Sequence, residues 1–332
     1  MHLRTRRARA AGVAAAVLVA SGLVVGAWGA STGRDSGDSG GRVPPSTQET
    51  HVADPSEDVP NAPEEPAAPD RLTGPAGPVR YVALGDSYTA APGVPDPAGG
   101  VCARSTSNYP SVLARSLPGT EVVDASCTGA DTRNLRGPQR VFAISVPPQL
   151  DALDARTDLV TLGMGGNDFG VFATLVTTCP TLAPTDPRGA PCRAAMRTPG
   201  GGDRLLSTIE RTGTRVLRGI RAIERRSPQA RVVVVGYPQL APRTGTCADL
   251  PLARGDYGYT RLVTRRLNTE LREAARRSGA AYVDVARASR GHDVCAQDPW
   301  VNGKRLTNQA IPYHPFAPEQ AAVARLVLRA LD

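Results

Sequence analysis

The chain has 332 residues, 41% of them hydrophobic, and this composition excludes a protein that is disordered throughout. Six cysteines in such a length are too few for a fold held together mainly by disulfides, whereas one α/β domain can occupy most of the chain. The formal net charge of +8 is unevenly distributed, with +4 on residues 1–30, −6 on residues 31–78 and +10 on residues 79–332. The basic part favours an anionic envelope surface as a weak partner. Nucleic acid is not expected, because the arginines are not interleaved with aromatic residues.

The first 30 residues have the pattern of a signal peptide. Four arginines precede an apolar run over residues 10–28, and small residues at the end of that run suit cleavage by a signal peptidase. The run is nearly long enough to span a bilayer, so an anchor on the outer face of the cytoplasmic membrane is the alternative to a secreted protein. The Arg6-Arg7 pair leaves both the general and the twin-arginine export routes open.

Residues 31–78 are predicted to be a disordered linker. They contain nine Pro, six Gly and five Ser with interspersed acidic residues and no apolar periodicity. Such a segment buries too little surface to offset the entropy lost on ordering. The folded domain is therefore expected to span residues 79–332.

From residue 79 onward, short runs rich in valine alternate with amphipathic stretches. The predicted strands are Val79–Leu84, Glu121–Ala125, Asp158–Leu162, Arg231–Gly236 and Ala280–Val285. Apolar residues at helical spacing predict helices over 205–223 and 262–275, and Pro318 opens a last helix. This alternation predicts a three-layer α/β/α sandwich around a mostly parallel, five-stranded sheet.

Three motifs rich in small residues follow the first three predicted strands: GDSY at 85–88, SCTGA at 126–130 and GMGGND at 163–168. Since the carboxyl ends of parallel strands meet at one edge of a sheet, we expect these motifs to lie close together. Taken singly, Ser87 and Asn167 are more often helix caps, and Gly129 is more often a turn glycine. Together they would surround one point with a hydroxyl and three N–H donors, namely the amides of Ser87 and Gly129 and the side chain of Asn167.

A serine hydroxyl needs a base, and only His292 and His314 lie within the predicted domain. His314 lies in a Pro-flanked loop directly before the last helix, and His292 lies close to Cys295. Either could be an ordinary surface or structural histidine. The family pattern described next favours His314.

In their order and spacing, the three motifs and a late His-Pro pair resemble the conserved blocks of the SGNH, or GDSL, hydrolases. The resemblance spans most of residues 79–332 and is closest to secreted actinobacterial esterases and lipases. It implies a flavodoxin-like sheet and ester hydrolysis through an acyl-serine intermediate. Carried over by position, it makes Ser87 the nucleophile and first oxyanion donor, Gly129 and Asn167 the other donors, and His314 the general base.

One position departs from that family. Its usual block has Asp three residues before the histidine, and here that residue is Ile311. The imidazole still needs an orienting group. We expect the main-chain carbonyl of Ile311 to orient His314 in a Ser-His dyad, with Asp293 or Asp298 as the alternative supporting acids.

The six cysteines of an exported chain are expected to be oxidised, although they allow 15 different pairings. Proximity along the chain and the family resemblance together suggest three pairs: Cys102 with Cys127, Cys179 with Cys192, and Cys247 with Cys295.

No metal or other cofactor is expected, because the sequence has neither zinc-ligand spacing nor a nucleotide-binding glycine motif. Two segments rich in Pro and Gly, 91–104 and 178–202, are expected to form loops around the acyl site. The predicted function is that of a monomeric, secreted esterase or lipase acting on lipid or short-chain esters. The alternatives are a polysaccharide deacetylase of the same fold and a non-catalytic module that binds the cell envelope.

Overall fold

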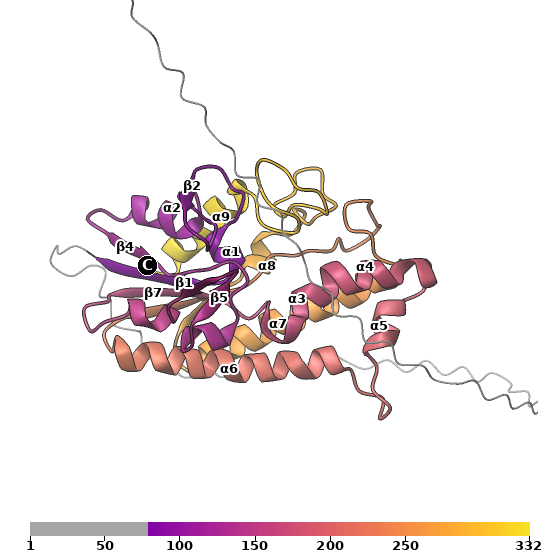
Figure 1. Ribbon diagram of the computed structural model, residues 1–332, viewed down its shortest axis with the longest axis horizontal. Coiled ribbons are helices and arrows are strands. Elements are labelled where there is room, and N and C mark those ends of the chain that lie inside the picture. The colour runs from indigo at the N-terminus through magenta and orange to yellow at the C-terminus, as the bar shows by residue number, and fades with distance from the viewer. Residues whose placement is uncertain (1–78) are drawn as a thin grey trace, which may run out of the picture. The chain divides into compact units, whose positions relative to one another are not determined.

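The centre of the structure is a five-stranded, wholly parallel sheet, seen in a computed structural model that describes residues 79–332 (Figure 1). The strand order is β4-β1-β7-β8-β9. The strands are β1 Arg80–Gly85, β4 Glu121–Asp124, β7 Leu159–Gly163, β8 Arg231–Val235 and β9 Ala281–Val283. All five predicted strands are confirmed, with ends that differ by at most two residues. The predicted signal peptide and linker lie outside the described residues.

The sheet buries both of its faces, which explains why its strands are nearly continuous apolar runs. Side chains alternate between two hydrophobic clusters along each strand. In β1, Tyr81 and Ala83 join the cluster on one face, while Val82 and Leu84 join the cluster on the other. This period of two places a helical layer on each side of the sheet.

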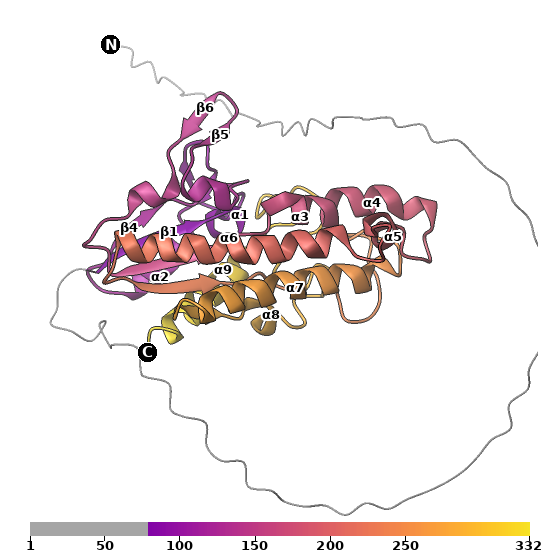
Figure 2. The ribbon, with the colours of Figure 1, turned by 90° about the horizontal axis from the view of Figure 1, so that it is seen from below.

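Long helices form the two outer layers. One face is covered by α6 Arg204–Arg226 and α7 Asp256–Arg276, which run side by side, and the other by α2 Tyr109–Ser116 and α9 Ala317–Arg329 (Figures 1 and 2). The predicted three-layer sandwich is therefore confirmed. Within residues 79–332, no helix combines the length and the apolarity needed to cross a membrane.

Shorter elements connect these layers. The two small hairpins are β2 Pro97–Gly99 with β3 Arg104–Ser105, and β5 Gln139–Val141 with β6 Ile144–Val146. The short helices are α1 Ser87–Ala90, α3 Val171–Ala173, α4 Cys179–Leu182, α5 Pro191–Met196 and α8 Val285–Ala288. The 3₁₀ turns are Thr132–Leu135, Gln149–Ala152, Asp168–Gly170 and Ala183–Thr185, and Thr174–Thr178 is a π-helical turn.

The segment 178–202 is not the irregular loop that its Pro and Gly content predicted, because it contains α4 and α5. Proline occupies the first turn of α5, where the missing N–H costs no hydrogen bond. The side chain of Asp256 accepts hydrogen bonds from the N–H groups of Cys192 and Arg193 and so caps α5. This contact comes from the start of α7, 64 residues from Cys192, and no local pattern reveals it.

All three predicted disulfides are confirmed: Cys102–Cys127, Cys179–Cys192 and Cys247–Cys295. The first bond joins the segment after β4 to the β2–β3 hairpin, and the second joins α4 to α5. These covalent links restrict the segments around the carboxyl edge of the sheet.

The ends of β1 and β7 approach each other so closely that they require glycine. A Cβ on Gly85 would lie 2.1 Å from Oγ1 of Thr89 and 2.9 Å from the carbonyl oxygen of Gly163. We therefore expect Gly85→Ala to lower the free energy of unfolding by about 1–3 kcal/mol, as overpacked core substitutions do. Urea unfolding measures this loss. Gly200→Ala is the control, because its added Cβ would have no neighbour within 4 Å; equal stability of the two variants would contradict the prediction.

Candidate active site

Ser87 is the first residue of α1, immediately after the turn that ends β1. The carboxylate of Asp86 caps this helix by accepting a hydrogen bond from the N–H of Tyr88 at 2.9 Å. Ser87 itself is 6% exposed, and within residues 79–332 its N–H donates to no protein acceptor. The first N–H groups of a helix have no intrahelical partner, so this group is free to bind a ligand oxygen.

Gly129 follows β4 in a tight turn, with a φ of +80° that favours glycine. The turn is closed by a hydrogen bond from the N–H of Ala130 to the carbonyl of Cys127, whose own N–H donates to the carbonyl of Gly85. Among the described residues, the N–H of Gly129 has no acceptor. The turn is therefore attached to the end of β1 and presents a second unused main-chain donor.

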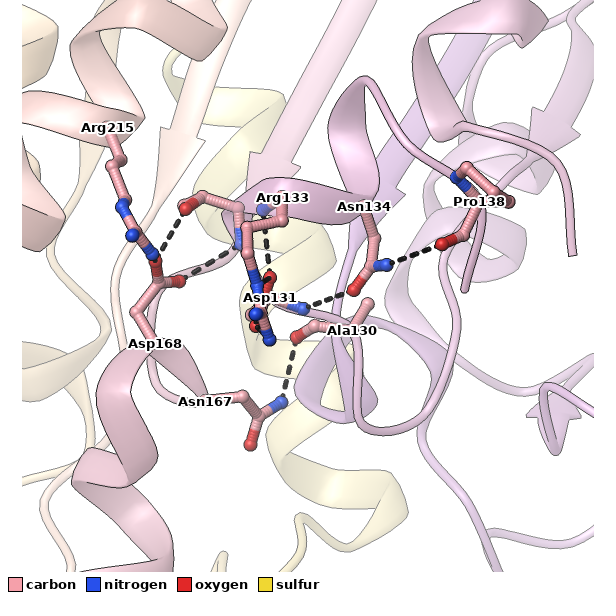
Figure 3. A network of polar contacts seen from close by, with 9 residues as sticks. Ala130, Asp131, Arg133, Asn134, Pro138, Asn167, Asp168 and Arg215 are labelled. Carbon is pink, nitrogen blue, oxygen red and sulfur yellow. Dashed lines mark hydrogen bonds and ion pairs between the residues drawn. The ribbon is translucent and has the colours of Figure 1, made fainter. Parts of the chain in front are cut away.

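Asn167 follows β7 and lies beside the same turn. Its side-chain amide donates to the carbonyl of Ala130 at 2.9 Å, as Figure 3 shows. A primary amide has two hydrogens, so this contact orients the group and leaves one N–H for a ligand. The prediction that the second and third motifs lie side by side is thereby confirmed for Ala130 and Asn167.

Asp168, at the end of the third motif, bonds the 3₁₀ turn that follows the second motif, a role that the sequence did not reveal. Its buried carboxylate accepts hydrogen bonds from the hydroxyl and N–H of Thr132, at 2.5 and 3.0 Å, and from the guanidinium of Arg215 at 3.2 Å (Figure 3). Desolvation raises the pKa of this carboxyl, and the hydrogen bonds from Thr132 and Arg215 lower it. The arrangement positions Asn167, its neighbour along the chain.

His314 lies against the first helix. The centroids of its ring and of the Tyr88 ring are 5.7 Å apart, and the hydroxyl of Tyr88 donates to the carbonyl of Tyr313 at 2.8 Å. The C-terminal loop is thus attached to the residue that follows Ser87. Within residues 79–332 no hydrogen bond joins the Ser87 hydroxyl to the imidazole. Hydrogen bonds between a nucleophile and its base often tighten only when substrate binds.

The carbonyl that contacts the imidazole is that of Pro312, so the expectation for Ile311 is wrong. Nδ1 of His314 lies 2.7 Å from the Pro312 oxygen. The Ile311 carbonyl instead accepts hydrogen bonds from the N–H of His314 at 3.2 Å and from the side chain of Asn302 at 3.2 Å. The physical reason is the turn over 311–314, which points the earlier carbonyl at the backbone and leaves the next one facing the ring.

The two acids considered as alternatives contact other groups. Asp293 accepts a hydrogen bond from the N–H of Cys295, and the main-chain oxygen of Asp298 lies 2.7 Å from Nδ1 of His292. The ring of His292 stacks on Trp300, with centroids 4.6 Å apart.

Burial lowers the pKa of His314 from 6.5 to about 4, and the hydrogen bond with Pro312 partly opposes this effect.

A buried hydrogen-bond chain joins the ends of three strands. The hydroxyl of Tyr237, which follows β8, donates to Oδ2 of Asp86 at 2.5 Å and accepts from the N–H of Gly166 at 2.7 Å. Desolvation raises the pKa of Asp86 to about 7, and the hydrogen bonds from Tyr237 and Tyr88 counteract part of that rise. Tyr237 was missed because a lone Gly-Tyr after a strand is not a recognisable motif.

Two side-chain amides complete the support. Gln149 accepts from the N–H of Gly85 and donates to its carbonyl, both at 2.8 Å, and Asn268 makes the same pair of contacts with the backbone of Tyr237. Amide side chains suit this task because they donate and accept at once.

Among the described residues no group of three His, Cys, Asp or Glu side chains is arranged to hold a metal ion.

Comparison with known proteins places this arrangement in context. Residues 83–317 match the GDSL-like Lipase/Acylhydrolase family. Lipase 2 of Streptomyces coelicolor is 40% identical over 245 residues, which make up 71% of this chain and 80% of that protein. A crystal structure of phospholipase A1 from Streptomyces albidoflavus is 28% identical with a TM-score of 0.63, covering 77% of this chain and all of that one. An extracellular lipase from Streptomyces rimosus is 29% identical with a TM-score of 0.61, covering 76% of this chain and 99% of that one.

Removing the Tyr237 hydroxyl tests the buried chain. We expect Tyr237→Phe to lower the free energy of unfolding by at least about 2 kcal/mol, because it leaves the N–H of Gly166 and an oxygen of Asp86 without a partner. Urea unfolding monitored by circular dichroism gives the value. Tyr282→Phe is the matched control, since the buried hydroxyl of Tyr282 has no hydrogen-bond partner. Equal losses in the two variants would show that the hydrogen bonds of Tyr237 contribute nothing to the free energy of unfolding.

Proposed function

Since the chain belongs to the GDSL-like lipase/acylhydrolase family and is a carboxylic ester hydrolase, we propose that it cleaves lipid or short-chain esters with a Ser87–His314 dyad. The resemblance noted in the sequence is thereby confirmed at the level of the family. A non-catalytic envelope module has no support once the family is established. The observation that carries the dyad is the His314 ring, oriented by a carbonyl and packed against the residue that follows Ser87.

In this proposal the contact with Pro312 selects the imidazole nitrogen that serves as the base. A carbonyl oxygen only accepts hydrogen bonds, so Nδ1 of His314 carries the proton and Nε2 carries the lone pair. Nε2 then takes the proton of Ser87 as its oxygen attacks the ester carbon, and returns it to the departing alcohol. A water molecule repeats the sequence on the acyl-serine and releases the acid. In this proposal the carbonyl replaces the acid of a full triad.

Three donors would stabilise the negative charge that develops on the ester oxygen. The N–H groups of Ser87 and Gly129 are unpaired among the described residues, and Asn167 retains one amide hydrogen. Donors held in place before the reaction stabilise the transition state without a cost of reorganisation. The contacts of Asp86, Ala130 and Asp168 hold these groups in position.

The proposed substrate is a lipid ester. Relatives that cover most of the chain carry the names lipase and phospholipase A1, and this supports an acyl chain in the substrate. Deacetylation of a polysaccharide is the remaining alternative within ester hydrolysis. The assays below separate the two.

We also propose that the protein acts outside the cytoplasm as a monomer, with weak affinity for an anionic envelope surface. Three disulfides are stable in an oxidising compartment, and residues 1–30 have the composition of a signal peptide. The net charge of +10 on residues 79–332 supports attraction to anionic surfaces.

A Ser87→Ala variant tests the proposed nucleophile. In a series of nitrophenyl esters of increasing acyl length, we expect the wild-type chain to release nitrophenol and the variant to lose at least about a thousandfold in kcat. Ser116→Ala, on an exposed turn of α2, should remain fully active. Acetylated xylan is assayed alongside. Release of acetate from xylan without activity on any longer acyl ester would favour the deacetylase, and activity that survives Ser87→Ala would exclude the acyl-serine mechanism.

The lowered pKa of His314 predicts the pH profile. A base with a folded-state pKa of about 4 stays unprotonated down to that pH, so kcat/KM should fall on the acid side near pH 4 rather than near 6.5. The same shift makes the folded state bind fewer protons than the unfolded state, so stability from this group is lost as pH falls from 6.5 toward 4. The profile is measured with a short, soluble ester, and His292→Gln is the control. An acid limb centred near 6.5 would contradict the proposed environment of His314.

A further inference from the structure

The β5–β6 hairpin projects from the sheet layers, as Figure 2 shows, and carries an unusual tip. Among the described residues four large hydrophobic side chains are exposed, and two of them lie on this hairpin within three residues of each other. Phe142 is 79% exposed and Ile144 is 51% exposed. An apolar pair held in water at the end of a projecting element is a contact surface without a partner among residues 79–332.

The backbone of the tip shows that phenylalanine is not there to stabilise the turn. Val141 pairs with Ile144, so Phe142 and Ala143 form a two-residue turn, and Phe142 has a φ of +53°. Glycine or asparagine dominates such positions, because a side chain in the left-handed region is strained. Strain of this kind persists most often where a residue serves binding.

The charged side chains of the segment that carries the hairpin are all arginines. The segment 132–150 contains three arginines and no acidic residue. Arg133 is paired with Asp131, whereas Arg136 and Arg140 are exposed and have no ion pair within the described part of the chain. Apolar side chains flanked by arginines match the surface of an anionic lipid layer, in which the apolar groups enter the acyl boundary and the guanidinium groups meet phosphates.

The base of the hairpin is attached to the proposed active site. The side chain of Gln139, in β5, donates to the carbonyl of Thr128 at 2.8 Å, directly before Gly129. Gln149, three residues after β6, holds both backbone groups of Gly85. Short, hydrogen-bonded segments therefore connect the hairpin to the Gly129 turn and to the strand that precedes Ser87. A lipid surface bound at the tip would lie at one end of this connection.

We propose that the β5–β6 hairpin is an interfacial anchor that inserts Phe142 and Ile144 into the surface of aggregated anionic lipid. The anchor would hold the enzyme on its substrate and present the Gly129 side of the site to the lipid. This inference rests on the proposed function, because it takes the aggregated ester as the substrate. The anchor binds and positions, and it takes no part in the chemical steps.

Binding is measured with the full chain in a Ser87→Ala background, so that the lipid is not consumed. The probe is a vesicle of phosphatidylglycerol and phosphatidylcholine, compared with phosphatidylcholine alone, in a flotation assay. We expect stronger binding to the anionic vesicle, and a loss of at least about tenfold in partitioning with Phe142→Gly combined with Ile144→Ser. Phe142→Trp should retain binding, because tryptophan suits a membrane interface.

Two controls separate anchoring from folding. Glycine relieves the positive φ, so Phe142→Gly should not lower the free energy of unfolding. Val122→Ser removes another exposed apolar side chain from the edge strand β4 and should leave vesicle binding unchanged.

Kinetics with Ser87 intact distinguish this inference from the proposed function. The hairpin double variant should hydrolyse a soluble short-chain ester within about twofold of wild type, while its rate on an emulsified long-chain ester falls about tenfold or more. The inference is overturned by undiminished vesicle binding in that variant, by an equal loss with Val122→Ser, by equal binding to neutral vesicles, or by equal losses on both esters. If wild type hydrolyses no ester, the proposed function fails, while the vesicle assay still decides whether the hairpin anchors.

Discussion

The hydrogen-bond chain from Asp86 through Tyr237 to Gly166 is the interaction on which the candidate site depends. Asp86, Tyr237 and Gly166 follow β1, β8 and β7. The Tyr237 hydroxyl therefore fixes the positions of these three strand ends relative to one another. Inside the protein each of these groups would be costly to leave unpaired, and the fully satisfied chain is correspondingly rigid. Because Asp86 also caps α1, the position of the Ser87 hydroxyl follows from the packing of the sheet.

Hydrogen bonds of both neutral and charged groups keep the segments of the candidate site in position. Asp168 joins the segment after β7 to the 3₁₀ turn that begins at Thr132, and Gln149 bonds both backbone groups of Gly85 at the end of β1. The C-terminal loop is attached separately, through the Tyr88 hydroxyl and the Pro312 carbonyl. With a carbonyl in place of a carboxylate next to His314, desolvation of the ring dominates its pKa. The His314 ring is thus neutral over a wide range of pH, with a main-chain carbonyl rather than a carboxylate as its hydrogen-bond partner.

Much of the fold was predictable because it depends on periodic burial. The valine-rich strands and the helical spacing over 205–223 reflect which side chains leave water, and this information is local. The same approach failed for the segment 178–202, since α5 depends on proline at its first turn and on a cap from Asp256 at the start of α7. Composition alone predicts that proline breaks a helix. Tertiary contacts can override this prediction, and they are not visible in the composition.

The sequence by itself determined the order and chemical types of the groups proposed for the candidate site. It identified a hydroxyl after the first strand, a glycine turn after the second, an amide after the third and an imidazole before the last helix. Only the tertiary structure decided which groups hold them, namely Pro312 rather than Ile311 for the imidazole and Tyr237 for Asp86. The reason is physical: a hydrogen bond between residues 151 apart, or the direction of one carbonyl in a turn, follows from how packed elements meet and leaves no periodic trace along the chain.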